Sequence, residues 1–250
     1  MRHDEIELYE PIDVLKPVGE EIWLVDGPIV QMSMYGFEIP FSTRMTIVRL
    51  SNGELWCHSP TRLTRELKAQ IDSLGSVRHL ISPNKIHYAH IGAWARAYPQ
   101  ATAWASPGVR DRAARQKIDV SFDADLENEP PLEWVAHLDQ LVFQGSRFMD
   151  EVVFFHPKSS TLILTDLIEN FELNKVSQRF GRLLKFVGIV DPDGKTALDL
   201  RMTFWGQKEQ SRRCLKRMLQ WNPQKVILAH GRWYENNGAA ELRRAFRWLE

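Results

Sequence analysis

Three short apolar runs in this chain end abruptly at polar residues, and this pattern constrains the fold most. The run Val77 to Ile81 predicts a buried strand that stops at Ser82-Pro83-Asn84, because proline cannot donate to a sheet ladder and serine and asparagine favour turns and helix caps. The runs Leu162 to Thr165 and Val226 to Ala229 are similar. In open α/β sheets ligands bind at the carboxyl ends of the strands. We therefore expect the side chains after these runs to gather at one edge.

Histidine and aspartate follow these runs. His87 and His90 come after the first, Asp166 after the second and His230 after the third. Two imidazoles three residues apart can share one face of a helix or of its entry loop. Imidazole and carboxylate suit zinc, iron or manganese, and two histidines with one carboxylate leave open positions for catalysis. A histidine pair alone is more often a polar surface, so the prediction depends on all three runs.

The rest of the chain predicts a mixed α/β fold. Asn52-Gly53 between apolar stretches is a strong hairpin signal, whereas Gly27-Pro28 predicts a turn. Helical spacing of leucine and isoleucine predicts a helix before Gly75, and with the next strand it forms a unit that covers one face of a sheet. Further segments complete the expected elements, namely strands at 134–144, 151–156 and 161–165, an amphipathic segment at 167–186, and helices at 204–219 and 239–249.

Composition excludes several classes of protein. The 250 residues include 32 basic and 32 acidic side chains, so charge gives no reason to expect a nucleic acid or an anionic membrane as partner. No apolar run approaches the 18 residues of a spanning helix, and the charged N-terminus does not resemble a signal peptide. Cys57 and Cys214 are too few for a disulfide framework, which favours a cytoplasmic protein. Nine tryptophans and twelve phenylalanines predict an aromatic core.

These motifs resemble the metallo-β-lactamase superfamily over roughly residues 20–249. The family's His-x-His-x-Asp-His motif overlays on residues 85–90, and its later aspartate and last histidine look like Asp166 and His230-Gly231. The chain also resembles an uncharacterised subgroup with Pro-Asn-x-x-His, Thr-Asp-Leu-Ile-x-Asn and Ala-His-Gly motifs. The resemblance implies an α/β (α+β) fold, a four-layer αββα sandwich. It would form a single domain over residues 1–250, with a loosely attached N-terminal arm at about 1–20.

The chain departs from the family's two-metal pattern. Lys85 and Arg147 stand where the resemblance implies histidines, and Ala89 stands where it implies an aspartate. We therefore expect one ion held by His90, Asp166 and His230, with His87 near enough to join it or to orient a water. Lys85 and Arg147, with Tyr88, would then contact a ligand, the two cations supplying charge in place of the second metal.

Two functions remain open. The first is a metal-dependent hydrolase of the metallo-β-lactamase fold, with one zinc, iron or manganese ion, a small-molecule substrate, and His87 and Asp166 as catalytic residues. The second is a non-catalytic member without metal that binds a small anionic ligand or a protein. Candidates for a general acid are Tyr88, Asp150, Glu151 and His156. His58 also follows a strand, but we leave it outside the site.

Overall fold

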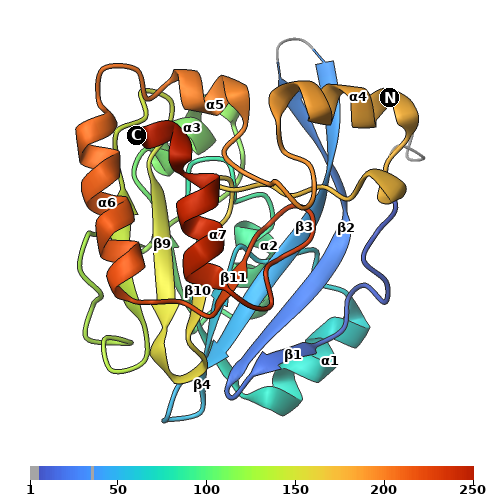
Figure 1. Ribbon diagram of the computed structural model, residues 1–250. Coiled ribbons are helices and arrows are strands. Elements are labelled where there is room, and N and C mark those ends of the chain that lie inside the picture. Colours follow the sequence, from blue (N-terminus) through green and yellow to red (C-terminus); the bar gives the residue numbers. More distant parts are fainter. Residues whose placement is uncertain (1–5, 35–36) are drawn as a thin grey trace.

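The strands of the protein form two sheets (Figure 1), seen in a computed structural model that describes residues 6–34 and 37–250. The larger sheet has the order β1-β2-β3-β4-β5-β6-β7, with bounds Lys16–Gly19, Ile22–Met34, Phe37–Arg49, Glu54–His58, Ser76–Ile81, Thr102–Ala105 and Ala124–Asp125. The smaller has the order β11-β10-β9-β8, and its strands β8 to β11 are Asp139–Phe143, Glu151–His156, Thr161–Ile163 and Lys225–Ile227. The first five residues of the predicted N-terminal arm lie outside the described residues.

Helices flank these sheets. In chain order, α1 to α7 are Arg65–Leu74, Ile91–Ala97, Val109–Gln116, Gln178–Val187, Leu198–Met202, Lys208–Gln220 and Gly238–Ala245. Short 3-10 turns occupy Pro157–Ser159, Leu173–Lys175 and Arg247–Leu249. Within the described ranges, no helix has both the length and the apolar character needed to cross a membrane.

The two sheets pack face to face because their strands are apolar on both sides. Along β4, Leu55 and Cys57 pack with α1 and α2, whereas Trp56 packs between the sheets. Along β9, Phe155 packs with α6 and α7, whereas Phe154 packs between the sheets. Alternate side chains of a strand point to opposite faces, so each sheet buries both. Figure 1 shows α6 and α7 beside the smaller sheet. The predicted four-layer αββα sandwich is confirmed.

The aromatic load lies largely in the core, as predicted. Trp134 is fully buried, and its ring meets those of Trp56 and Trp104 edge-on at centroid distances of 6.3 and 4.6 Å. However, Trp134 is not in a strand, and β8 begins only at Asp139. The indole N–H donates to the side chain of Gln140 at 3.0 Å. Packing between the sheets and this hydrogen bond therefore hold Trp134 in a turn, despite the strand predicted at 134–144.

Two other segments also differ from the prediction. The hairpin at Asn52-Gly53 is confirmed, since β3 and β4 pair antiparallel around a glycine with φ +81°. In contrast, the turn predicted at Gly27-Pro28 is wrong. The strand β2 continues through it, with a register shift between Gly27 and Ile29, because a bulge accommodates a proline that cannot donate to the ladder. The amphipathic segment predicted at 167–186 is helical only from Gln178.

A buried histidine makes the fold sensitive to acid. His58 is 2% exposed, and burial, followed by the charge of His87, lowers its pKa to about 3. The unfolded chain binds this proton near pH 6.5 and the folded chain only near pH 3, so stability falls as pH falls through this window. We expect a loss from this residue of up to about 1.4 kcal/mol per pH unit.

Urea unfolding at pH 7 and pH 5 tests this expectation. His58→Asn removes the ionisable group and should reduce the loss of stability between the two pH values. An unchanged loss in the variant would contradict the assignment to His58.

Candidate metal centre

Three side chains that follow the carboxyl ends of three strands lie close together. They are His87 in the loop after β5, Asp166 after β10 and His230 after β11, and each offers one ligand atom within 4.8 Å of the other two. The Nε2 atoms of His87 and His230 lie 3.2 and 3.3 Å from the carboxylate oxygens of Asp166. Asp166 and His230 are buried, and His87 is half-buried. The structure therefore brings these predicted residues together, and we call them the triad.

The larger sheet positions His230. Its Nδ1 donates a hydrogen bond to the backbone oxygen of Ser42 on β3, at 2.7 Å. Arg44, also on β3, donates to the carbonyls of Leu228 and Gly231 at 2.7 and 2.8 Å. Because a carbonyl only accepts, Nδ1 carries a proton, and in the neutral ring Nε2 is left with its lone pair toward Asp166. This is the arrangement of a metal-bound histidine.

A turn closed by Asn84 positions His87. The side-chain oxygen of Asn84 accepts hydrogen bonds from the backbone N–H groups of Ile86 and His87, at 2.9 and 3.1 Å. The Nδ1 atom of His87 lies 2.8 Å from the hydroxyl of Ser59, a residue with φ +50°. The imidazole is thus held on its far side and presents Nε2 to Asp166.

Asn84 and Glu151 also hold Asp166. The Nδ2 group of Asn84 donates to Asp166 Oδ2 at 2.6 Å and approaches Glu151 and Thr165 at 3.2 and 3.1 Å. The carboxylate of Glu151 accepts the backbone N–H groups of Thr165 and Asp166, both at 2.8 Å. Asn84 and Glu151 are 0% and 1% exposed, so this polar network lies in the interior, where unpaired polar groups are costly.

The charges in this network favour a cation. Burial alone would raise the pKa of Asp166, but the charges and hydrogen bonds of His87 and His230 lower it well below its usual range. Burial also works to lower the pKa of His87, but the charge and hydrogen bond of Asp166 raise it. Burial and then the charge of Asp166 raise the pKa of Glu151. The buried Asp166 carboxylate therefore needs positive charge, either as protons on the imidazoles or as a metal ion.

The triad fits a metal ion. Tetrahedral zinc, with bonds of about 2.0–2.2 Å, holds its ligand atoms about 3.4 Å apart. Asp166 Oδ1 lies 3.3 Å from each of the two Nε2 atoms, which matches this value. Three protein ligands leave a position open for a water or a substrate. The ring proton of His230 is also held on the outer side of the site, by the carbonyl of Ser42, as metal binding requires.

His90 is not in this group of ligand atoms. It precedes α2 at the N-cap position, and its Nε2 is buried with no hydrogen-bond partner among the described residues. Burial, and then the charge of Arg62, lowers its pKa. The turn closed by Asn84 ends before α2 begins, so His87 and His90 do not share a helical face. The structure thus makes His87, not His90, the partner of Asp166 and His230.

The other predicted residues are dispersed. Lys85 lies with its Nζ 4.2 Å from the ring centroid of Phe148, and Arg147 is exposed. Tyr88 is 5% exposed and donates its hydroxyl to Gln116, so it packs in the core. His156 lies at the opposite end of β9 from Glu151, against Ser159.

Sequence reasoning missed two residues near the triad, Asn84 and Glu169, and gave a third, Glu151, another role. Asn84 was treated only as a turn former, although its place in the Pro-Asn-x-x-His pattern was a signal. Glu151 was a low-ranked acid candidate, and its signal was a charge at the start of an apolar strand. Glu169 is 7% exposed, with one oxygen unpaired in the described structure, and burial raises its pKa to about 8 against the opposing charge of His230. No spacing rule pointed to Glu169.

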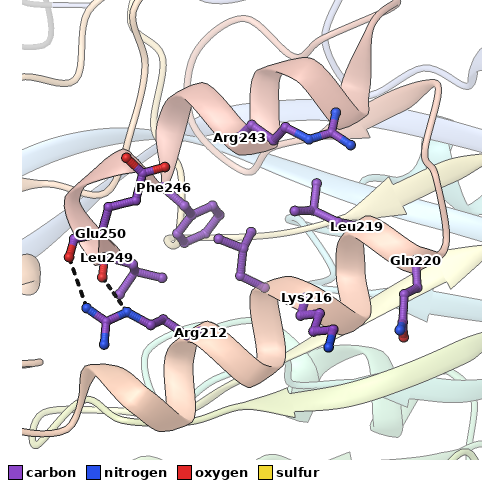
Figure 2. Close-up of a pocket in the computed structure, with 9 residues that line it drawn as sticks. Arg212, Lys216, Leu219, Gln220, Arg243, Phe246, Leu249 and Glu250 are labelled. Carbon is purple, nitrogen blue, oxygen red and sulfur yellow. Dashed lines mark hydrogen bonds between the residues drawn. The ribbon is translucent and has the colours of Figure 1, made fainter.

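A separate groove of about 530 Å³ lies between α6, α7 and the C-terminal turn. Figure 2 shows its apolar floor at Leu219, Phe246 and Leu249 and cationic side chains at its rim. Arg212 donates to the backbone oxygens of Leu249 and Glu250, at 2.6 and 3.0 Å. None of the residues that line this groove belongs to the triad.

Comparison with known proteins shows the family and the fold of this chain. Residues 20–178 match the model of a family described as "Domain of unknown function (DUF4336)". No curated protein sequence matches the chain. The solved structure of the metallo-β-lactamase DIM-1 exposed to ceftazidime has a TM-score of 0.64 at 16% identity, covering 99% of this chain and 100% of that chain.

Other solved structures agree. The metallo-β-lactamase FIM-1 from Pseudomonas aeruginosa, in its mono-zinc form, has a TM-score of 0.59 at 15% identity, covering 98% of both chains. The Flv1 flavodiiron core from Synechocystis sp. PCC6803, which was soaked with metal, has a TM-score of 0.61 at 12% identity, covering 98% of this chain and 61% of that chain. At these identities the likeness shows the fold. The predicted metallo-β-lactamase fold is confirmed.

Proposed function

The chain belongs to the family described as domain of unknown function DUF4336, and from the triad we propose that it is a metal-dependent hydrolase with a single ion. His87, Asp166 and His230 would hold this ion, with zinc as the first candidate and iron or manganese as alternatives. The substrate would be a small molecule that enters the open coordination position.

One observation carries the proposal. The Nε2 atoms of two histidines point at the same buried carboxylate, and the Nδ1 atom of each has another partner. Because the Ser42 carbonyl fixes the proton of His230 on Nδ1, a neutral His230 directs the lone pair of Nε2 at Asp166, which is unfavourable without a cation between them. The outer partners Ser42 and Ser59 fix both rings, as hydrogen-bonded outer groups do around catalytic metals.

The chemistry would follow from this arrangement. When bound, such an ion supplies Lewis-acid activation of water at neutral pH. Asp166 and the two imidazoles would fix its place, and Asn84 and Glu151 would keep Asp166 oriented. Burial raises the pKa of Glu169 to about 8, against the charge of His230, so this carboxyl would hold a proton near neutral pH.

A second candidate function has its own support. With both imidazoles protonated, the triad is already a set of ion pairs at 3.2 and 3.3 Å. Such a site needs no metal, and the protein would then be a non-catalytic member of the fold that binds a small anionic ligand. The two candidates differ in whether the purified protein contains metal.

Elemental analysis of the purified full-length protein separates them. We expect about one ion per chain, and His230→Ala should lose it because only two ligands remain. The control is His137→Ala, which removes an imidazole that lies against Ser51 on the loop between β3 and β4. Two ions per chain, no ion, or equal metal content in the two variants would contradict the proposal.

A further inference from the structure

Three cationic side chains without carboxylate partners lie on the turn that carries His87 and on the neighbouring helix α3. Lys85 belongs to the same turn as Asn84 and His87, and Arg112 and Arg115 belong to α3. Across residues 6–34 and 37–250, none of these three forms an ion pair or a side-chain hydrogen bond. On the same helix, Arg110 does pair, with Asp125 at 2.9 Å. We call Lys85, Arg112 and Arg115 the basic cluster.

Contacts show that Lys85 lies against the start of α3. Its Cδ atom is 3.9 Å from the position that a Cβ atom would take on Gly108, the residue before α3. Arg112 and Arg115 lie one and two turns beyond Gly108 on the same face of α3. The three cations therefore lie along one side of this helix. An unfavourable cluster of this kind is stabilised by an anion placed among the cations.

Two buried donors in the same region also lack acceptors. The Nε atom of Arg112 and the hydroxyl of Ser106 are buried without hydrogen-bond partners in the described part of the chain, and Ser106 is 3% exposed. Ser106 directly follows β6, the parallel neighbour of β5, so it lies at the sheet edge where the turn of Lys85 begins. Buried donors are nearly always paired in folded proteins. Both donors are therefore free to bind a ligand that accepts hydrogen bonds.

We propose that the basic cluster binds a phosphate-type dianion, the anionic group of the substrate that reaches the triad. Three cations are a better match for a group with about two negative charges than for a carboxylate with one. Arginine suits phosphate because its planar guanidinium group can donate two hydrogen bonds. Phe148 lies across the Lys85 ammonium and is 40% exposed, so it offers an apolar surface beside the anion. The identification of this anion as part of a substrate rests on the proposed function.

Binding of inorganic phosphate to the full-length, chelator-treated protein tests the proposal by calorimetry at constant ionic strength. Chelation keeps phosphate from binding through a metal. We expect Arg112→Gln to weaken binding about tenfold, the effect of losing a hydrogen bond to a charged group. Arg115→Gln should weaken it about threefold, because Arg115 is exposed to solvent. If Arg112→Gln fails to fold, the loss of binding in Arg115→Gln still tests the proposal.

The control is Arg179→Gln, which removes one exposed arginine from α4 and should change binding less than about twofold, as expected for a distant screened charge. Equal losses in all three variants, no binding of phosphate to the unmodified protein, or equally tight binding of acetate would overturn the proposal. Metal content is measured in parallel. If the protein contains no metal as purified, before chelation, but binds phosphate through the basic cluster, the hydrolase proposal is contradicted. If the protein contains metal as purified but fails the phosphate test, only the proposal for the basic cluster is contradicted.

Discussion

Replacing Asn84 by aspartate should destabilise the protein by about 3–5 kcal/mol at pH 7, as expected for a buried charge without a partner. The Nδ2 group of Asn84 lies 2.6 Å from Asp166 and 3.2 Å from Glu151. The variant would place a third carboxyl group beside these two and remove the donor between them. Asn84 is 0% exposed, so water cannot screen the repulsion.

The effect of Asn84→Asp should depend on pH in a defined direction. Repulsion and burial would raise the pKa of the new carboxyl above its unfolded value of about 4. The folded variant would then bind more protons than the unfolded one, so its stability is lost as pH rises through that window. In urea unfolding, the loss of stability relative to the unmodified protein should therefore be larger at pH 7 than at pH 5.

Asn52→Asp is the matched control. Asn52 is exposed in the hairpin between β3 and β4, and its side-chain oxygen accepts the backbone N–H of Glu54 at 3.0 Å, which an aspartate can also do. We expect a change within about 0.5 kcal/mol, as for most surface substitutions. Similar losses in the two variants would show that Asn84 does not bridge the carboxyl groups.

The layers of the fold were predictable from the sequence because they follow from local patterns. Strands such as β4 and β9 are short apolar runs bounded by turn residues, and Asn52-Gly53 has the chemistry of a hairpin turn. Trp134 was misplaced because its burial depends on two tryptophans from other strands. Long-range packing of this kind leaves no periodic signal in the chain.

The site was predictable in its strand ends but not in its connections. Asp166 and His230 follow apolar runs, and they meet because β10 and β11 are parallel neighbours. Whether His87 or His90 joins them depends on a turn closed by Asn84, a contact between a side chain and the backbone that spacing does not show. The pairing of Asn84 with Asp166 joins residues far apart in the chain, so only the folded structure reveals it.

Replacing Gly231 by alanine should destabilise the protein by about 4 kcal/mol or more, because the added methyl group meets backbone atoms. A Cβ at this position would lie 2.1 Å from the carbonyl oxygen of Asn170 and 2.8 Å from the nitrogen of Phe171. Gly231 also has φ +84°, which side chains rarely adopt. The backbone of 230–231 would have to move, and His230 would move with it.

Gly53→Ala separates the clash from the backbone strain. Gly53 has φ +81°, nearly the value of Gly231, but no atom lies within 4 Å of its added Cβ. The strain alone should cost about 1–2 kcal/mol. The difference between the two variants in the free energy of unfolding, measured with urea, therefore gives the cost of the clash. Gly231→Ala should in addition lower metal affinity by at least about tenfold, as loss of ligand positioning does. Equal stability of the two variants, or undiminished metal binding in Gly231→Ala, would show that the loop after β11 can change conformation without moving His230. The tight contact with Asn170 would then not be what holds this histidine toward Asp166.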